Sequence, residues 1–176
     1  MEDARYMLAA ALADPNPVLI FEHVVLYNAE GELDANTSAV DIAQARVRRP
    51  GSDLTLATYG NSLPKCLAAA DALAGDGIAA EVIDLRVLRP LDSATLLASV
   101  SRTRRCVVVD EGWRSGSISA EVAARLAEDA FFELDAPVRR VCGREVPVPY
   151  AAQLEEAALP QVSDIVAAAR ALVPSR

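Results

Sequence analysis

The hydrophobic and polar positions from residue 53 onward change their period in a regular way. Short apolar runs with a strand-like pattern alternate with Ala-rich stretches that have the spacing of an amphipathic helix. Strands separated by helices of about 10 to 15 residues are typical of βαβ units. We therefore expect an α/β fold with a parallel sheet covered on both faces. The expected strands are residues 54–59, 78–88, 105–110 and 138–142, and the expected helices are 62–74, 92–101, 119–130 and 162–172.

The pattern before residue 46 is different. Residues 3–13 have helical spacing, and the proline-rich turn that follows ends the helix. Residues 18–21 form a continuous apolar run, which predicts a short buried strand. A helix, a turn and a strand look like the last unit of a preceding domain. We expect residues 1–24 to be a remnant of that domain, 25–45 to be a linker, and 46–176 to be the main domain.

Charged residues interrupt the apolar stretch in the middle of the chain. Arg86 and Arg89 lie in or just after a strand that otherwise looks buried. An unpaired buried charge costs several kcal/mol, so we expect carboxylate or carbonyl partners for both arginines. Anion binding is the alternative. Asp92 or Ser93 is expected to cap the next helix.

Composition narrows the classes of partner. The 176 residues carry a net charge of −8, which argues against nucleic acid or an anionic membrane and suits a basic protein partner. No apolar run approaches the roughly 20 residues that cross a bilayer, and the start of the chain is acidic where a signal peptide would be basic. We therefore expect a cytoplasmic protein. Cys66, Cys106 and Cys142 are far apart in apolar surroundings, which predicts reduced core residues.

The strongest candidate for chemistry is the loop of residues 110–113, with two acids beside the only tryptophan. It follows a strand at the end where open α/β sheets bind ligands. Ser115 and Ser117 lack a plausible histidine, because His23 belongs to another segment. A contact surface and catalysis both remain open for this loop. His23 is interpreted as a structural hydrogen-bonding residue, with general-base catalysis as its alternative.

Four segments in register carry a family resemblance: EVIDLRVLRPLD at 81–92, CVVVDEGW at 106–113, LDAP at 134–137 and VPVPYA at 146–151. Together they resemble the C-terminal half of the β-subunit of thiamine-diphosphate-dependent 2-oxoacid dehydrogenases, the decarboxylating component of the pyruvate and branched-chain complexes. The resemblance runs from about residue 3 to residue 173. It implies a three-layer αβα sandwich similar to the transketolase C-terminal domain, with one antiparallel strand in a mostly parallel sheet.

The resemblance also implies an assembly. Its partners would be an α-subunit, a second β-subunit in a heterotetramer, and the dihydrolipoyl acyltransferase core. Thiamine diphosphate and magnesium would be held only in the full assembly, and the catalytic carboxylate would lie ahead of residue 1. No catalytic residue is therefore expected here, and the isolated chain is not expected to be an enzyme. Pyruvate is the expected substrate of the whole, with branched-chain 2-oxoacids second.

Two other interpretations remain open. One is a non-catalytic binding module, the product of a truncated or split gene. The other is the transketolase or deoxyxylulose-phosphate synthase branch, which shares the fold. The segments at 134–137 and 146–151 are more similar to the 2-oxoacid branch.

Seven residues receive roles from the resemblance alone. Ala11, Asp14 and Asn16 match positions that surround a structural potassium ion, and shaping a proline turn is the alternative for the last two.

Asp135 and the C-terminal tail with Arg176 match the surface that docks the basic peripheral domain of the acyltransferase, although a basic tail departs from the family pattern. Glu111 and Trp113 match a subunit contact near the active-site entrance.

Overall fold

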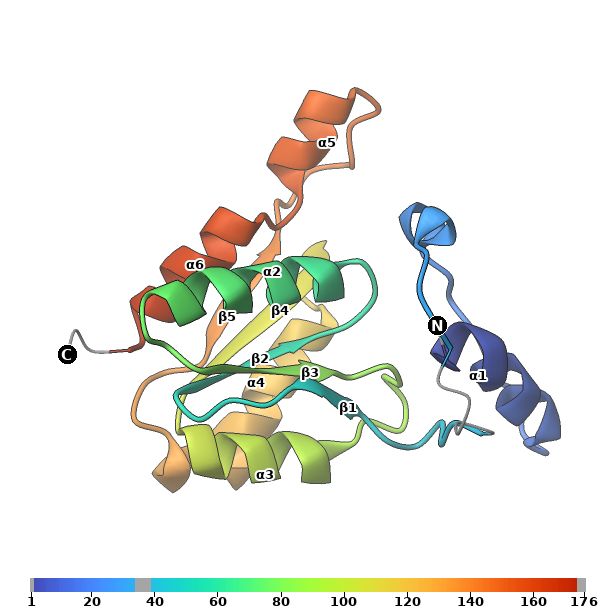
Figure 1. Cartoon of the computed structure of the whole chain (residues 1–176), viewed down its shortest axis with the longest axis horizontal. Helices are drawn as coiled ribbons and strands as arrows, with labels where there is room; N and C mark the ends of the chain where they lie inside the picture. Colours follow the sequence, from blue (N-terminus) through green and yellow to red (C-terminus); the bar gives the residue numbers. More distant parts are fainter. Residues whose placement is uncertain (1, 34–38, 174–176) are drawn as a thin grey trace.

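The computed structural model describes residues 2–33 and 39–173. Its centre is a five-stranded sheet in the order β1-β3-β2-β4-β5 (Figure 1). β1 runs antiparallel to β3 and the other pairings are parallel, which confirms the mostly parallel sheet and the single antiparallel strand. The strands are β1 (Arg46–Arg49), β2 (Leu54–Thr58), β3 (Ala80–Asp84), β4 (Cys106–Trp113) and β5 (Arg139–Gly143).

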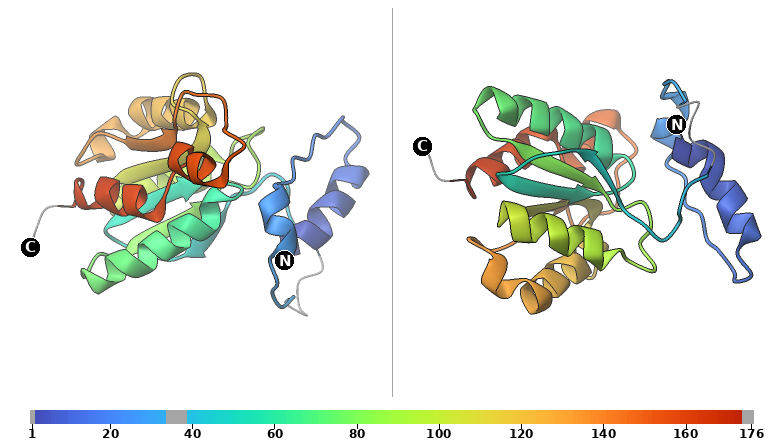
Figure 2. Two further views of the ribbon diagram at one scale, coloured as in Figure 1. Left: turned by 90° about the horizontal axis from the view of Figure 1, so that it is seen from above. Right: turned by 60° about the horizontal axis from the view of Figure 1, so that its bottom comes forward.

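Helices cover both faces of this sheet and complete the expected three layers. α2 and α6 pack on one face, and α3 and α4 on the other (Figures 1 and 2). The helical elements are α1 (Glu2–Ala13), η1 (Val24–Asn28), α2 (Ser62–Gly75), α3 (Ser93–Thr103), α4 (Ile118–Asp129), η2 (Phe131–Glu133), α5 (Ala152–Ala158) and α6 (Val162–Arg170). None of the helices within residues 2–33 and 39–173 combines the length and apolar character needed to cross a bilayer.

The two faces of the sheet build separate apolar cores. Leu56 and Val82 belong to the core under α2 and α6, whereas Ala57 and Ile83 belong to the core under α3 and α4. Successive side chains of a strand point to opposite faces, so a continuous apolar run fills both cores. This explains why the central strands have no alternation of polar and apolar residues.

The prediction of a carboxylate or carbonyl partner is wrong for Arg89, which lies exposed beyond the end of β3 and makes no hydrogen bond or ion pair with the residues described, because water solvates its charge. For Arg86 the prediction is confirmed. Its guanidinium donates hydrogen bonds to the Gln44 carbonyl and to Asp3, and only 8% of its side chain is exposed. Arg48 joins Asp3 to the buried Asp84. Structural pairing of Arg86 is thus confirmed, and its partners tie α1 and the segment before β1 to the end of β3.

Two predictions about strands are wrong. Residues 18–21 form no strand: Leu19 is 83% and Phe21 is 90% exposed, because the described part of the chain offers no strand beside them. The central strand ends at Asp84 instead of residue 88, since Arg86 has φ 54° and leaves the extended path. The capping prediction is confirmed, because Asp92 accepts a hydrogen bond from the Thr95 amide at 3.0 Å.

Candidate functional site

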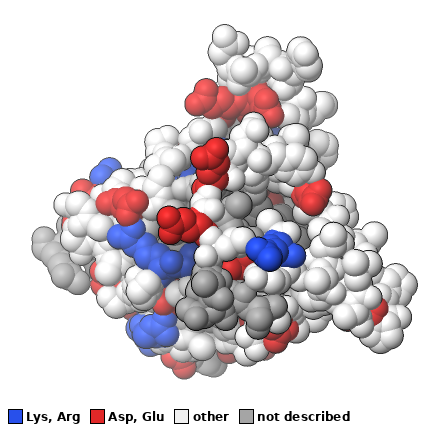
Figure 3. Space-filling view, turned by 45° about the vertical axis from the view of Figure 1, so that its right-hand side comes forward, with Lys and Arg blue, Asp and Glu red and all other residues white. Residues whose placement is uncertain are grey.

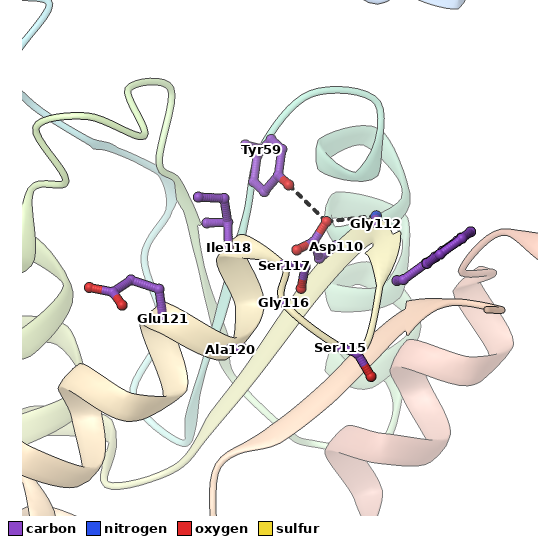
Figure 4. Close-up of a pocket in the computed structure, with 10 residues that line it drawn as sticks. Tyr59, Asp110, Gly112, Ser115, Gly116, Ser117, Ile118, Ala120 and Glu121 are labelled. Atoms are coloured by element: carbon purple, nitrogen blue, oxygen red, sulfur yellow. Dashed lines mark hydrogen bonds between the residues drawn. The ribbon is translucent and has the colours of Figure 1, made fainter.

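The candidate site lies where β2 and β4 end and α4 begins. A hollow of about 800 Å³ opens there, and its lining residues come from the ends of these strands and from the first turn of the helix (Figure 4). They are Tyr59, Asp110, Gly112, Trp113, Ser115, Gly116, Ser117, Ile118, Ala120 and Glu121. This is the edge of a parallel sheet at which ligands usually bind, as predicted for residues 110–113. The prediction that these residues form a loop is wrong, because they continue β4 through an irregularity in its pairing with β5, and the loop begins after Trp113.

Asp110 organises the hollow. Its side chain is buried and accepts hydrogen bonds from the Tyr59 hydroxyl and the Gly112 amide, both at 2.7 Å (Figure 4). It also accepts one from the Ser119 amide at 3.0 Å. Ser119 lies in the first turn of α4, so the carboxylate also complements the positive end of that helix. Burial first, and then the bond to Asp110, raise the pKa of Tyr59 well above its usual value. The phenol of Tyr59 is therefore neutral, and it is one of three groups that donate hydrogen bonds to the Asp110 carboxylate. These bonds position the loop.

Glu111 contacts a segment that the sequence analysis assigned elsewhere. Its carboxylate lies 3.0 Å from Nε2 of His23, accepts a hydrogen bond from the side-chain amide of Asn61 at 3.1 Å, and lies 4.0 Å from Nζ of Lys65. His23 is therefore not remote from Glu111, contrary to the prediction, because the N-terminal segment folds back to it. The sequence analysis did not connect Asn61 and Lys65 with Glu111. Their position at the start of α2, beside the strand end, is the signal that could have done so.

The loop after β4 is joined to the loop after β5. The Trp113 indole, which is half exposed, donates a hydrogen bond to the Val146 carbonyl at 3.2 Å. Ser115 donates to Glu145 from both its amide and its hydroxyl, and these bonds lower the pKa of the Glu145 carboxyl. The hydroxyl of Ser117 lies 2.7 Å from that of Ser119.

No serine nucleophile is assembled with a histidine in the described part of the chain. The single histidine contacts Glu111, and the two loop serines bond to Glu145 and Ser119. The residues described also contain no group of three or more His, Cys, Asp or Glu side chains that could hold a metal ion. Asp110, Ser115 and Ser117 of the hollow are thus engaged in bonds within the chain.

The cysteines divide into two kinds. Cys66 and Cys106 are fully buried, and burial raises the pKa of each thiol to about 12. Both are free thiols in the apolar cores, as predicted. Cys142 is only partly buried, and its sulfur lies 3.2 Å from the Ser119 hydroxyl.

The order of the strands and the position of the hollow agree with the protein family that the sequence matches. The family model described as the transketolase C-terminal domain covers residues 43–165. The chain belongs to this transketolase C-terminal domain family.

Curated relatives extend the match over nearly the whole chain. Subunit beta-1 of the pyruvate dehydrogenase E1 component from Arabidopsis thaliana is 46% identical over 174 residues, which are 96% of this chain and 48% of that protein. The mitochondrial beta subunit from Drosophila melanogaster is 46% identical over 95% of this chain and 47% of its own length. The Rhizobium meliloti beta subunit is 42% identical over 97% of this chain and 37% of its own length. The chain thus spans about half the length, or less, of the curated relatives it matches.

Solved structures agree on the fold. A split gene transketolase, an inactive beta4 tetramer, superposes with a TM-score of 0.68 at 28% identity, covering 81% of this chain and 45% of that one. A 2-oxoglutarate:ferredoxin oxidoreductase from Magnetococcus marinus superposes with a TM-score of 0.51 at 15% identity over 74% of this chain and 19% of its own. The second likeness concerns the fold alone.

The hollow does not suit the diphosphate of thiamine diphosphate. A diphosphate needs cationic side chains or free amides, whereas this transketolase C-terminal domain presents Asp110 and Glu121 there. The Gly112 and Ser119 amides already donate to Asp110. The residues that line the hollow therefore offer the diphosphate no binding site.

Asp135 lies at the opposite end of α4 from the hollow and is paired within the chain. Its two carboxylate oxygens accept hydrogen bonds from Arg104 at 2.7 Å and from Arg105 at 3.2 Å, and 36% of its side chain remains exposed. Any basic group on a partner would share this carboxylate with the two arginines. Arg176, the other residue of the expected docking surface, lies outside the described residues.

The expected potassium ligands lie in the last turn of α1 and in the turn that follows it. Asp14 accepts hydrogen bonds from the Asn16 amide at 2.8 Å and from its side chain at 2.9 Å, and the Ala11 carbonyl accepts from the Asp14 amide at 3.3 Å. The bonds from Asn16 lower the pKa of the Asp14 carboxyl. These contacts shape the turn whether or not an ion binds, so the potassium site stays a prediction.

Proposed function

We propose that this chain is the C-terminal part of the β-subunit of a 2-oxoacid dehydrogenase decarboxylating component, with pyruvate as the substrate of the whole enzyme. The observation that carries the proposal is the identity of 42–46% to pyruvate dehydrogenase E1 beta subunits over 95–97% of this chain. The whole enzyme would decarboxylate pyruvate oxidatively and pass the acetyl group to lipoamide.

The role of this part is assembly and docking. Its proposed partners are the α-subunit, a second β-subunit and the dihydrolipoyl acyltransferase core, while thiamine diphosphate and magnesium are held by the assembled enzyme. Large apolar side chains are exposed on it, including Trp113 at 51%, Val148 at 61% and Tyr150 at 105%. Apolar groups gathered on a surface mark protein contacts. Glu111 and Trp113 are proposed as part of the subunit contact.

Charge supports protein partners over nucleic acid. On the face shown in Figure 3 acidic and basic side chains are interspersed, and acidic side chains gather below the projecting arm that carries α5. A nucleic-acid binder needs a concentrated basic face instead. We also retain the division into residues 1–24, 25–45 and 46–176, the potassium site, and the cytoplasmic location as proposals.

Affinity purification from the native cell tests the proposed function. The expected result is co-elution of an α-subunit and an acyltransferase, with thiamine-diphosphate-dependent decarboxylation that is faster with pyruvate than with branched-chain 2-oxoacids. Mass spectrometry identifies the proteins, and release of labelled carbon dioxide measures the reaction. Co-elution of neither partner would overturn the proposal.

A second candidate function is the non-catalytic binding module of a split gene. It is favoured by the likeness to a split gene transketolase described as an inactive beta4 tetramer. The same purification separates the two candidates. Only copies of this chain in the eluate, without decarboxylation, would support the module.

Replacing Asp135 by alanine is expected to weaken binding of the acyltransferase peripheral domain by less than about 1 kcal/mol, because the exposed carboxylate is already shared between two arginines. The loss should shrink as salt rises. Calorimetry on the assembled β-subunit measures the loss of binding free energy. The matched control is Glu121→Ala, which also removes a surface acid paired with an arginine, but at the other end of α4. Equal affinities of both variants would remove Asp135 from the docking surface.

A further inference from the structure

Most arginines of the described residues form an ion pair with a carboxylate of this chain. Such pairing is expected in a chain with 25 acidic and 17 basic residues. Within residues 2–33 and 39–173, Arg5 and Arg89 have no such partner, and the same holds for four arginines on β5 or directly after β4 or β5, which are Arg114, Arg139, Arg140 and Arg144. Because β5 is an edge strand, unpaired positive charge is concentrated at one edge of the sheet.

Arg114 and Arg140 are bonded to each other in a reciprocal way. Nη1 of Arg114 donates a hydrogen bond to the carbonyl of Arg140 at 3.2 Å, and Nη1 of Arg140 donates one to the carbonyl of Arg114 at 2.7 Å. Each guanidinium is thus fixed beside the backbone of the other residue. Two like charges held in one small region repel each other, and an anion between them would relieve that repulsion.

The neighbouring acid, Glu145, does not pair with these arginines. Its Oε1 accepts hydrogen bonds from the Ser115 amide at 3.0 Å and from the Ser115 hydroxyl at 2.7 Å. These two bonds lower the pKa of the Glu145 carboxyl more than the charge of Arg114 does. Nε and Nη2 of Arg114 and of Arg140 have no hydrogen-bond partner among the described residues, so both guanidiniums keep donors for a ligand.

The chemistry of the guanidinium group determines which ligand fits. A planar guanidinium donates parallel hydrogen bonds to two oxygens of a carboxylate or a phosphate, and it stays charged at physiological pH. Binding costs less entropy when the side chain is fixed beforehand, and here the reciprocal carbonyl bonds fix both guanidiniums. Arg139 differs, because successive side chains of a strand point to opposite faces and it makes no such bond.

We propose that Arg114 and Arg140 form a binding site for one oxyanion, a carboxylate or a phosphate group, where the segment after β4 meets β5. The site is distinct from the hollow, because neither arginine lines the hollow. Trp113 and Ser115 do line it and flank Arg114 in the chain, so the oxyanion site lies at the rim of the hollow. The proposal concerns only residues of this chain and does not depend on the proposed function.

NMR titration of the full chain tests the site, with acetate and inorganic phosphate as the probes. Sodium chloride keeps the ionic strength constant, so that general screening does not change. The Nε–H signals of Arg114 and Arg140 are expected to shift together and to saturate with a dissociation constant of about 1 to 10 mM, because water competes at an exposed site. Tighter binding of acetate assigns the site to a carboxylate, and tighter binding of phosphate assigns it to a phosphate group.

Arg114→Gln and Arg140→Gln should each weaken binding about tenfold, since each variant removes a charged donor. Arg139→Gln is the matched control, because it removes the same charge from the adjacent position of β5 and should leave the affinity unchanged. No saturable shift with either probe would overturn the proposal. So would an equal loss of affinity in Arg139→Gln, because the binding would then depend on net charge alone.

Discussion

Replacing Arg48 by methionine is expected to lower the free energy of unfolding by about 3 kcal/mol at neutral pH, because it leaves the carboxylate of Asp84 buried without its partner. Arg48 bonds Asp84 through both Nε at 3.1 Å and Nη2 at 2.7 Å, and only 8% of the Asp84 side chain is exposed. The same guanidinium contacts Asp3, so the variant also loosens α1. Chemical denaturation measures the loss.

The loss should depend on pH. Burial raises the pKa of the Asp84 carboxyl, and the hydrogen bonds and charge of Arg48 oppose that rise. Removing Arg48 therefore raises the folded-state pKa further. A carboxyl that binds its proton more tightly in the folded state than in the unfolded state loses stability as pH rises from its ordinary value near 4 through the folded-state pKa. The variant should be closer to the unmodified protein at about pH 5 than at about pH 8.

Arg49→Met is the matched control, because Arg49 pairs with an Asp71 side chain that is 74% exposed. Its cost should stay below about 1 kcal/mol and vary little with pH. Adding Asp84→Asn to Arg48→Met should restore part of the stability, since the buried charge is then gone. Equal losses from Arg48→Met and Arg49→Met would contradict the explanation.

Gly51→Ala is expected to destabilise the fold by about 3 kcal/mol or more, because backbone atoms occupy the space of the new methyl group. A Cβ at this position would lie 2.2 Å from the Glu81 nitrogen and 2.3 Å from the Ala80 carbonyl carbon. These atoms belong to the start of β3, the central partner of both β1 and β2. The loop that contains Gly51 or the strand must therefore move. Thermal unfolding followed by circular dichroism measures the effect.

Gly75→Ala provides the control for Gly51→Ala. Gly75 ends α2 and a Cβ there would meet no atom within 4 Å. Alanine in that helical position is expected to stabilise the protein by about 0.5 to 1 kcal/mol. A Gly51→Ala variant that melts at the same temperature as the unmodified protein would show that the loop yields at little cost.

The local pattern of apolar and polar residues was sufficient to predict the order and the approximate bounds of the main helices and strands. The helix predicted at 62–74 spans Ser62–Gly75, and the one predicted at 119–130 spans Ile118–Asp129. The Asp92 cap was predictable because the side chain and the amide it bonds are three residues apart. The location of residues 110–113 at the carboxyl end of an apolar strand was predictable, although they belong to the strand and not to a loop. In each case the interaction that decides the structure lies within a few neighbouring residues, so the sequence displays it directly.

Only the tertiary structure decided the remaining features, because they depend on groups far apart in the chain. Residues Arg46–Arg49 have no apolar period and become β1 because the edge of β3 is open to them. The apolar run 18–21 has a strand pattern but stays exposed, since no described strand lies beside it. His23 contacts Glu111 across 88 positions, and Asp135 is paired with arginines 30 and 31 positions before it. The sequence shows which charged residues are present, but folding determines which of them come within hydrogen-bonding distance of one another. That distance decides whether a charged side chain is part of a structural pair or is free to bind a partner.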